Sequence, residues 1–79
     1  MTWRYIASKR IETYEGGDSE EVWEVREYYN DIDSWTVNAM QPHGGTREEL
    51  IHDLEMMLED VKRGDYLDLD DEEVKNDEA

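Results

Sequence analysis

The sequence predicts a small α+β domain in which a three-stranded antiparallel meander carries one amphipathic helix on one face. Two observations lead to this prediction. Two runs of alternating apolar and polar residues flank a glycine turn, and a capped run of helical periodicity follows them. We expect one ββ(β)α domain over residues 1–69 and an acidic, flexible tail over residues 70–79. A core of this size contributes about 3–5 kcal/mol to stability.

Alternation predicts two strands, at residues 3–12 and 21–29, joined by the turn cluster Glu15-Gly16-Gly17-Asp18. A second turn at residues 30–34 precedes a short third strand at residues 35–39. Pro42 ends this strand because proline cannot donate to a central ladder.

The helix is the clearest local signal. Thr46 is a helix N-cap, and Glu49 completes a capping box three residues later. An apolar stripe of period 3.6 follows, made of Leu50, Ile51, Leu54, Met57, Leu58 and Val61. Gly64 is predicted to end the helix as its C′ residue. Residues 65–69 alternate weakly and predict a short fourth strand at the sheet edge.

The predicted sheet has one dry face and one wet face, as antiparallel sheets commonly do. We expect the helix stripe to cover the dry face, which carries Trp3, Tyr5, Trp23, Val25, Trp35 and Val37. The wet face would carry Arg4, Glu24, Arg26 and Tyr28.

The charge is lopsided: 23 acidic residues stand against 8 basic ones, a net charge of −15, and all the acids follow Ile11. Direct binding to nucleic acid requires clustered lysine and arginine and is therefore not expected. The chain has no cysteine, which excludes disulfides and thiolate metal sites and fits the cytoplasm of a bacterial cell. We expect no signal peptide, no membrane span, no bound metal and no cofactor.

Catalysis is not expected either. His43 lies in a glycine loop and His52 on a helix flank, and no serine occupies a strained strand-to-helix turn. Carboxylate pairs are plentiful, but a chain this acidic brings carboxylates together by chance. We therefore expect a protein that is not an enzyme.

The acidity favours a partner with a positively charged surface. Duplex DNA carries about one negative charge per 1.7 Å of its axis, and a compact acidic domain could present a comparable field to a groove built for DNA. The alternative interpretation is that the negative charge serves only to keep the domain soluble. The candidate contact residues are carboxylates of the two turns and the helix: Glu15, Asp18, Glu20, Glu21, Asp31, Asp33, Glu48, Asp53, Glu55, Glu59 and Asp60.

Recurring aromatic and helical motifs carry a resemblance to a group of small bacterial and phage proteins, which implies a ββ(β)α fold. The motifs are Trp3-Arg4-Tyr5, Tyr28-Tyr29, Ser34-Trp35-Thr36, Glu48-Glu49-Leu50 and Met57-Leu58. In size, acidity and lack of cysteine the chain is similar to the anti-CRISPR proteins of phages. That resemblance implies an inhibitor that blocks target DNA at a type I Cascade complex.

A second resemblance leaves an alternative open. The strands followed by Gly45-Thr46-Arg47-Glu48-Glu49-Leu50 resemble the antitoxin of the HicB kind, without its DNA-binding appendage. The chain would then be an antitoxin or a small interaction module that uses its sheet face or a helix patch near Met56. In either case we expect a monomer or a weak dimer.

Overall fold

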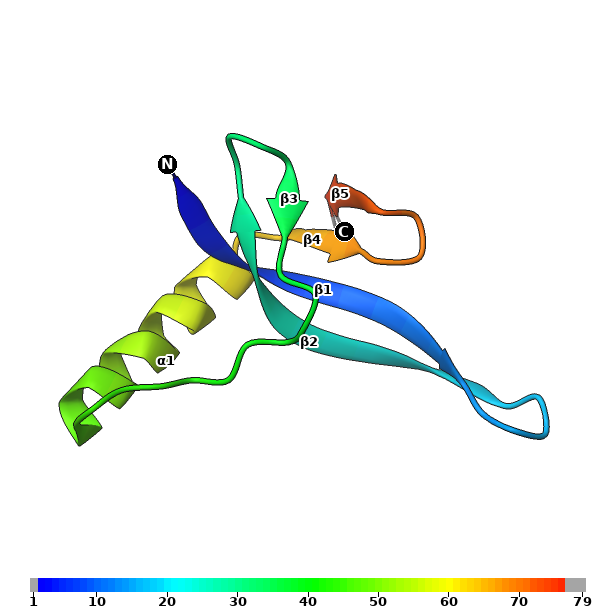
Figure 1. Ribbon diagram of the computed structural model, residues 1–79, viewed down its shortest axis with the longest axis horizontal. Helices are drawn as coiled ribbons and strands as arrows, with labels where there is room; N and C mark the ends of the chain where they lie inside the picture. The colour runs from blue at the N-terminus through cyan, green and yellow to red at the C-terminus, as the bar shows by residue number, and fades with distance from the viewer. Residues whose placement is uncertain (1, 77–79) are drawn as a thin grey trace.

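The computed structural model describes residues 2–76, which form one helix and a curled, mixed five-stranded sheet (Figure 1). The elements in chain order are β1 (Trp3–Thr13), β2 (Ser19–Tyr29), β3 (Ser34–Trp35), α1 (Arg47–Val61), β4 (Asp65–Asp68) and β5 (Glu73–Asn76). The sheet order is β3-β2-β1-β4-β5, and only the β1–β4 pair is parallel. The α+β class is confirmed, while the predicted three-stranded meander describes only β1 to β3.

The β1–β2 hairpin is the longest element of the fold. Its register runs without interruption from the Trp3↔Tyr29 pair to the Thr13↔Ser19 pair. Gly16 and Gly17 adopt φ angles of 101° and 93°, which glycine reaches at little cost. The two long strands and the glycine turn between them are therefore confirmed.

Helix α1 begins where the sequence predicts, but it ends earlier, since Lys62 is its C-cap and Gly64 lies two residues after the cap. The Thr46 side chain accepts a hydrogen bond from the Glu49 backbone N–H at 3.1 Å. The Glu49 carboxylate accepts from the backbone N–H of Gly45 instead of from that of Thr46, so half of the predicted capping box is displaced by one residue. Gly64 turns the chain with φ of 92°.

The C-terminal strands correct the predicted topology. The strand expected at the edge, β4, lies between β1 and β5. It pairs with β1 in parallel, and α1 provides the crossover connection that a parallel pair requires. The edge position belongs to β5, which falls in the segment expected to be a flexible tail. Residues 77–79 of that predicted tail lie outside the described part of the chain.

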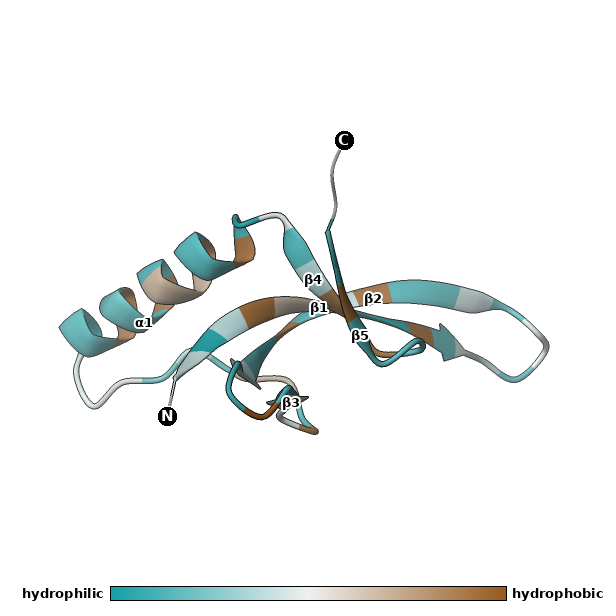
Figure 2. Cartoon of the chain, turned by 90° about the horizontal axis from the view of Figure 1, so that it is seen from above, coloured by the Kyte–Doolittle hydropathy of each residue, from teal (hydrophilic) through white to brown (hydrophobic). Residues whose placement is uncertain are grey.

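The expected distribution of dry and wet faces is also wrong. The face opposite α1 holds Ile6, Ser8 and Leu67, which are completely buried, and the nearly buried Arg26. Figure 2 shows α1 on one side of the β1–β2 hairpin, with β3 and the following connection on the other side. That connection reaches Arg26, whose guanidinium donates to the Val37 carbonyl at 3.4 Å.

The third strand is shorter than predicted, and its side chains do not meet the helix. β3 ends at Trp35, which pairs with Tyr28 on the face opposite α1. The expected partner of the helix stripe in this segment, Val37, is 88% exposed. The connection stays beside β2 through two backbone hydrogen bonds, from Thr36 N to Glu27 O and from Met40 N to Val25 O.

Helix α1 is rotated relative to the predicted stripe. Met57 is buried against the sheet, but Ile51, Leu54 and Leu58 are about half exposed. The reason lies in polar contacts with β1: Asp53 and Asp60 both bind Tyr5, so the side of the helix that carries them faces the strand.

Candidate site: an acidic hairpin arm

The distal half of the β1–β2 hairpin projects beyond the rest of the sheet (Figure 1). β4 pairs with β1 only at residues 7–9, and β3 pairs with β2 only at residues 28–29. Beyond these pairings the two long strands bind mainly each other. We name residues 11–23 the acidic arm, because this segment contains five acidic residues and no basic one: Glu12, Glu15, Asp18, Glu20 and Glu21.

Negative charges face each other within the acidic arm. Glu12 is directly opposite Glu20 in the antiparallel register. Like charges at directly opposed positions destabilise a sheet. Arg10 offsets part of this repulsion through an ion pair with Glu12 at 3.4 Å, while its stronger contact is with Glu24 at 2.9 Å.

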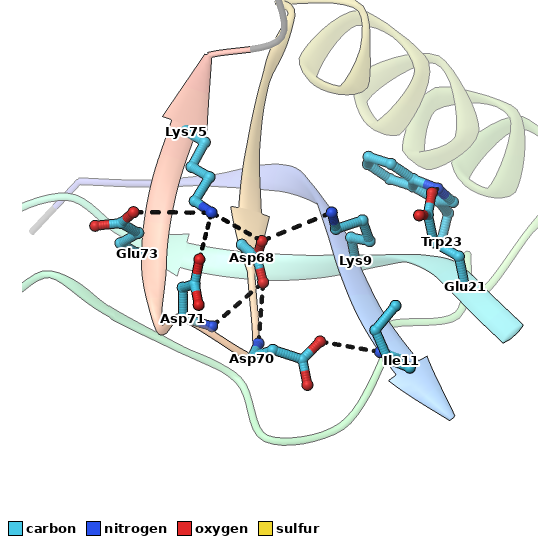
Figure 3. Close-up of polar contacts among 9 residues, drawn as sticks. All are labelled: Lys9, Ile11, Glu21, Trp23, Asp68, Asp70, Asp71, Glu73 and Lys75. Atoms are coloured by element: carbon cyan, nitrogen blue, oxygen red, sulfur yellow. Dashed lines mark hydrogen bonds and ion pairs between the residues drawn. The ribbon is translucent and has the colours of Figure 1, made fainter. Parts of the chain in front are cut away.

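Two carboxylates of the acidic arm are oriented by aromatic side chains. The Tyr14 hydroxyl donates to Glu20 at 2.6 Å. The Trp23 indole N–H donates to Glu21 at 2.7 Å, and Figure 3 shows these two side chains beside each other. The hydrogen bond to Glu20 raises the pKa of the Tyr14 hydroxyl. These two hydrogen bonds hold the carboxylates of Glu20 and Glu21 in fixed orientations. Glu15 and Asp18 are exposed at the tip.

The second turn holds a third carboxylate in the same way. Asp33 has a left-handed φ of 47° and accepts a hydrogen bond from the Tyr28 hydroxyl at 2.5 Å. This contact is the largest cause of the raised Tyr28 pKa. Asp31 is exposed in the same turn. The turn joins β2 to β3, far along β2 from the acidic arm (Figure 1).

Two of the candidate helix acids are used inside the molecule. Asp53 accepts the Tyr5 hydroxyl at 2.5 Å and the His43 backbone N–H at 2.8 Å. These two contacts, with the Tyr5 bond the larger, lower the pKa of Asp53. Asp60 accepts the Tyr5 backbone N–H at 3.0 Å. Both carboxylates thus hold α1 on β1.

The other helix acids face solvent. Glu48, Glu55 and Glu59 are exposed along the side of α1 that points away from the sheet, and none forms an ion pair with another residue of the range 2–76. Glu55 and Glu59 border a shallow hollow of about 300 Å³, which His52, Met56 and Asp60 also line. All five residues belong to one helix, so this hollow is a surface depression and not a cleft between elements.

The structure therefore divides the eleven candidate acids into separate groups. The first-turn acids belong to the acidic arm at one end of the molecule, and the helix acids lie at the other end, along a longest dimension of 44 Å (Figure 1). Sequence reasoning missed Glu12 as a member of the acidic arm. The signal was present, because counting back from the glycine turn places Glu12 opposite Glu20.

A second polar cluster lies at the C-terminal strands (Figure 3). Asp68 is buried, and it accepts from Lys75 at 3.1 Å and lies 3.7 Å from the Lys9 ammonium. Its other oxygen accepts the backbone N–H groups of Asp70 and Asp71. The Lys75 hydrogen bond is the largest cause of the lowered Asp68 pKa. The cluster ties β5 and the β4–β5 turn to the sheet, and so its role is structural.

The described residues, 2–76, contain no group of three or more histidine, aspartate or glutamate side chains arranged to hold a metal ion. In the same range, no helix has the length and apolar character needed to cross a membrane. Comparison of the sequence with protein-family models, with curated proteins and with solved structures found no match.

Proposed function

We propose that the protein binds a positively charged groove of another protein through its acidic arm and thereby competes with nucleic acid for that groove. The observation that carries the proposal is the excess negative charge of the arm, which has five carboxylates and no base within residues 11–23 of a projecting hairpin, with Glu12 paired to Arg10 at its base. The activity is inhibition by occupation, and no reaction is catalysed.

The energetics of the arm support this role. Placing Glu12 opposite Glu20 costs stability in the free protein. A cationic groove would remove that cost, because the basic side chains of the groove screen the two carboxylates from each other. Local features that oppose folding are commonly found at functional sites.

The shape of the arm supports the same role. The arm is a narrow two-stranded ribbon that projects beyond the rest of the sheet, so it can enter a groove of another protein without hindrance from the body of the domain (Figure 1). The bonds from Tyr14 and Trp23 fix two of the charges before binding. Pre-organised groups lose less conformational entropy on association.

The type I Cascade complex of bacterial CRISPR systems is the groove that we propose as the target. Its DNA-binding surface must be cationic to hold a phosphate backbone. A small domain with a net charge of −15 could occupy that surface, as the resemblance to anti-CRISPR proteins implies.

A competition assay tests the proposal. A fluorescein-labelled target duplex is bound to purified type I Cascade, and the unlabelled protein is titrated while fluorescence anisotropy is followed. The parent protein is expected to displace the duplex, and its inhibition constant should weaken steeply between 50 and 200 mM salt, as counterion release requires (on the order of tenfold or more).

Two matched variants locate the contact. The arm variant carries Glu15→Gln, Asp18→Asn and Glu21→Gln, and the helix variant carries the glutamine substitution at Glu48, Glu55 and Glu59. Each removes three negative charges from exposed positions. The arm variant is expected to lose about tenfold or more in inhibition, while the helix variant keeps most of it.

The outcomes separate the parts of the proposal. Equal losses in the two variants would show that net charge alone governs binding and would refute the specific role of the arm. A parent protein that fails to displace the duplex at any salt concentration would reject Cascade as the target.

A further inference from the structure

Helix α1 exposes a row of large apolar side chains. Ile51, Leu54 and Leu58 are 47%, 46% and 54% exposed. Their spacing of three and four residues places them on one side of the helix, and Val61 continues the row at the C-terminal end. Helical rise makes this row about 15 Å long. Exposure of three consecutive members of one row is unusual for a chain so poor in apolar residues.

The row leads into a hollow between α1 and the sheet. Val61 lines a space of about 230 Å³ together with Ala7, Trp23, Glu24 and Val25 of the two long strands. The Trp23 indole is 49% exposed and contacts Tyr66 at a ring-centroid distance of 5.3 Å. We name this combined surface the apolar groove; it consists of Ile51, Leu54, Leu58, Val61, Ala7, Trp23 and Val25.

The charges around the apolar groove select its occupant. Glu48 and Glu55 follow the row on its solvent side, and on the sheet Glu21 is bonded to Trp23. Arg47 and Lys62 lie at the two ends of the row, and Lys9 lies opposite Trp23, where its ammonium is 5.6 Å from the centroid of the Tyr66 ring. A second copy of the chain would bring a net charge of −15 against −15, and such repulsion opposes association. The occupant is therefore basic.

We propose that the apolar groove binds an amphipathic α-helix of a partner protein that presents leucine-like residues on one face and lysine or arginine on its flanks. A helix laid into a hydrophobic groove through anchors at i, i+3, i+4 and i+7 is an established mode of recognition. A row of about 15 Å accommodates nearly three turns of such a helix. The apolar groove borders the acidic arm at Trp23 and Glu21, but this inference differs from the proposed role of the arm because it depends on apolar contacts along α1.

A designed peptide serves as the probe. An 18-residue peptide of leucine and lysine, with leucine at helical spacing, is compared with a scrambled peptide of the same composition by isothermal titration calorimetry in 150 mM salt. The amphipathic peptide is expected to bind the parent protein about tenfold more tightly than the scrambled peptide, because only the former aligns its leucines with the row.

Two uncharged double variants provide the matched test. Leu54→Gln with Leu58→Gln alters the groove, and Ile32→Gln with Val37→Gln alters apolar side chains that are exposed elsewhere. The groove variant should weaken binding of the amphipathic peptide about tenfold or more, and the control variant should leave it unchanged. Thermal unfolding of both variants verifies that the fold is retained.

Three results would overturn the inference. Equal affinity for the amphipathic and scrambled peptides would show binding by charge alone. Unaltered affinity of the groove variant would show that the peptide binds elsewhere. A parent protein that is dimeric by light scattering, with a monomeric groove variant, would identify a second copy of this chain as the occupant.

Discussion

Removing the Tyr5 hydroxyl should loosen α1 from the sheet. Tyr5 is buried, and its hydroxyl donates to Asp53 at 2.5 Å while its backbone N–H donates to Asp60. The substitution Tyr5→Phe deletes only the first of these bonds. The aromatic ring, which packs edge-on against Trp3 at a centroid distance of 5.2 Å, is retained.

The magnitude follows from the surroundings of Asp53. A hydrogen bond to a charged group contributes about 1.5–3 kcal/mol. Because Asp53 is half-exposed and keeps the His43 N–H, water can replace the hydroxyl, and the loss should lie near about 1.5 kcal/mol. For a domain of this length that corresponds to a decrease of roughly 6–12 °C in melting temperature.

Urea unfolding followed by tryptophan fluorescence measures the effect. Tyr29→Phe is the matched control, because its hydroxyl donates to Glu27 at the sheet surface, and its loss should stay within about 0.5 kcal/mol. The double variant Tyr5→Phe with Asp53→Asn completes a cycle that should show coupling of about 1 kcal/mol. A Tyr5→Phe protein as stable as the parent would refute the view that this hydrogen bond holds the helix.

Acid should erase the difference between parent and Tyr5→Phe. The Tyr5 bond, with help from the His43 N–H, lowers the pKa of Asp53 below its ordinary value of 3.8. A carboxyl whose pKa is lowered by folding stabilises the native state above its unfolded pKa, and this contribution disappears as the pH falls through the folded pKa. The stability difference should therefore be constant from pH 7 to 5 and shrink below about pH 4; a difference that grows on acidification would contradict this assignment.

Two further predictions concern charge. The substitution Glu12→Gln should raise stability by about 0.5 kcal/mol at low salt, since it removes the repulsion from Glu20, while Arg10 loses its 3.4 Å pair with Glu12 but keeps its closer partner Glu24. Calorimetry in 0.5 M sodium chloride should show a smaller gain. A lower melting temperature at low salt would contradict the assigned repulsion. The substitution Lys75→Met should leave the buried Asp68 without its closest cation. It should also remove the ion pair between Lys75 and Asp71. Hydrogen exchange should then accelerate in β5 before the rest of the sheet, whereas uniform acceleration would contradict a local role.

Local signals in this sequence predicted local structure well. The hairpin follows from alternation on both sides of Gly16 and Gly17, and the helix start follows from Thr46, with Gly64 two residues after the C-cap. Each of these features depends on residues that are neighbours in the chain. Such neighbours fix backbone geometry largely without help from the rest of the fold.

Non-local pairing was not predictable from the same signals. The segment Asp65–Asp68 is too short and too polar to be distinguished from an edge strand, yet parallel pairing with β1 places Leu67 at the centre of the sheet. β5 was hidden by the acidic residues on both sides of it, and the contact that joins it to β4 is the ion pair between Lys75 and Asp68 across the β4–β5 turn. An ion pair between paired strands leaves no periodic signal in the sequence.

The rotation of α1 explains the remaining error in the core. Hydrophobic periodicity assigned Leu54 and Leu58 to the buried side of the helix. Asp53 and Asp60 accept hydrogen bonds from Tyr5, and these bonds turn the side that carries Leu54 and Leu58 partly away from the strand. The hydrogen bonds of Asp53 and Asp60 therefore determine which side of the amphipathic helix contacts the sheet. The spacing of apolar residues alone does not specify that side.

The interior position of β4 has a consequence for biosynthesis. The two most deeply buried apolar residues, Ile6 and Leu67, come from β1 and β4, which β2, β3 and α1 separate in the chain. During translation the hairpin can pair as soon as it emerges, but β1 keeps an unpaired edge until the ribosome has released β4. The sheet can therefore close only after α1 has been made, and a ribosome that stops before residue 65 releases a chain whose open edge invites aggregation.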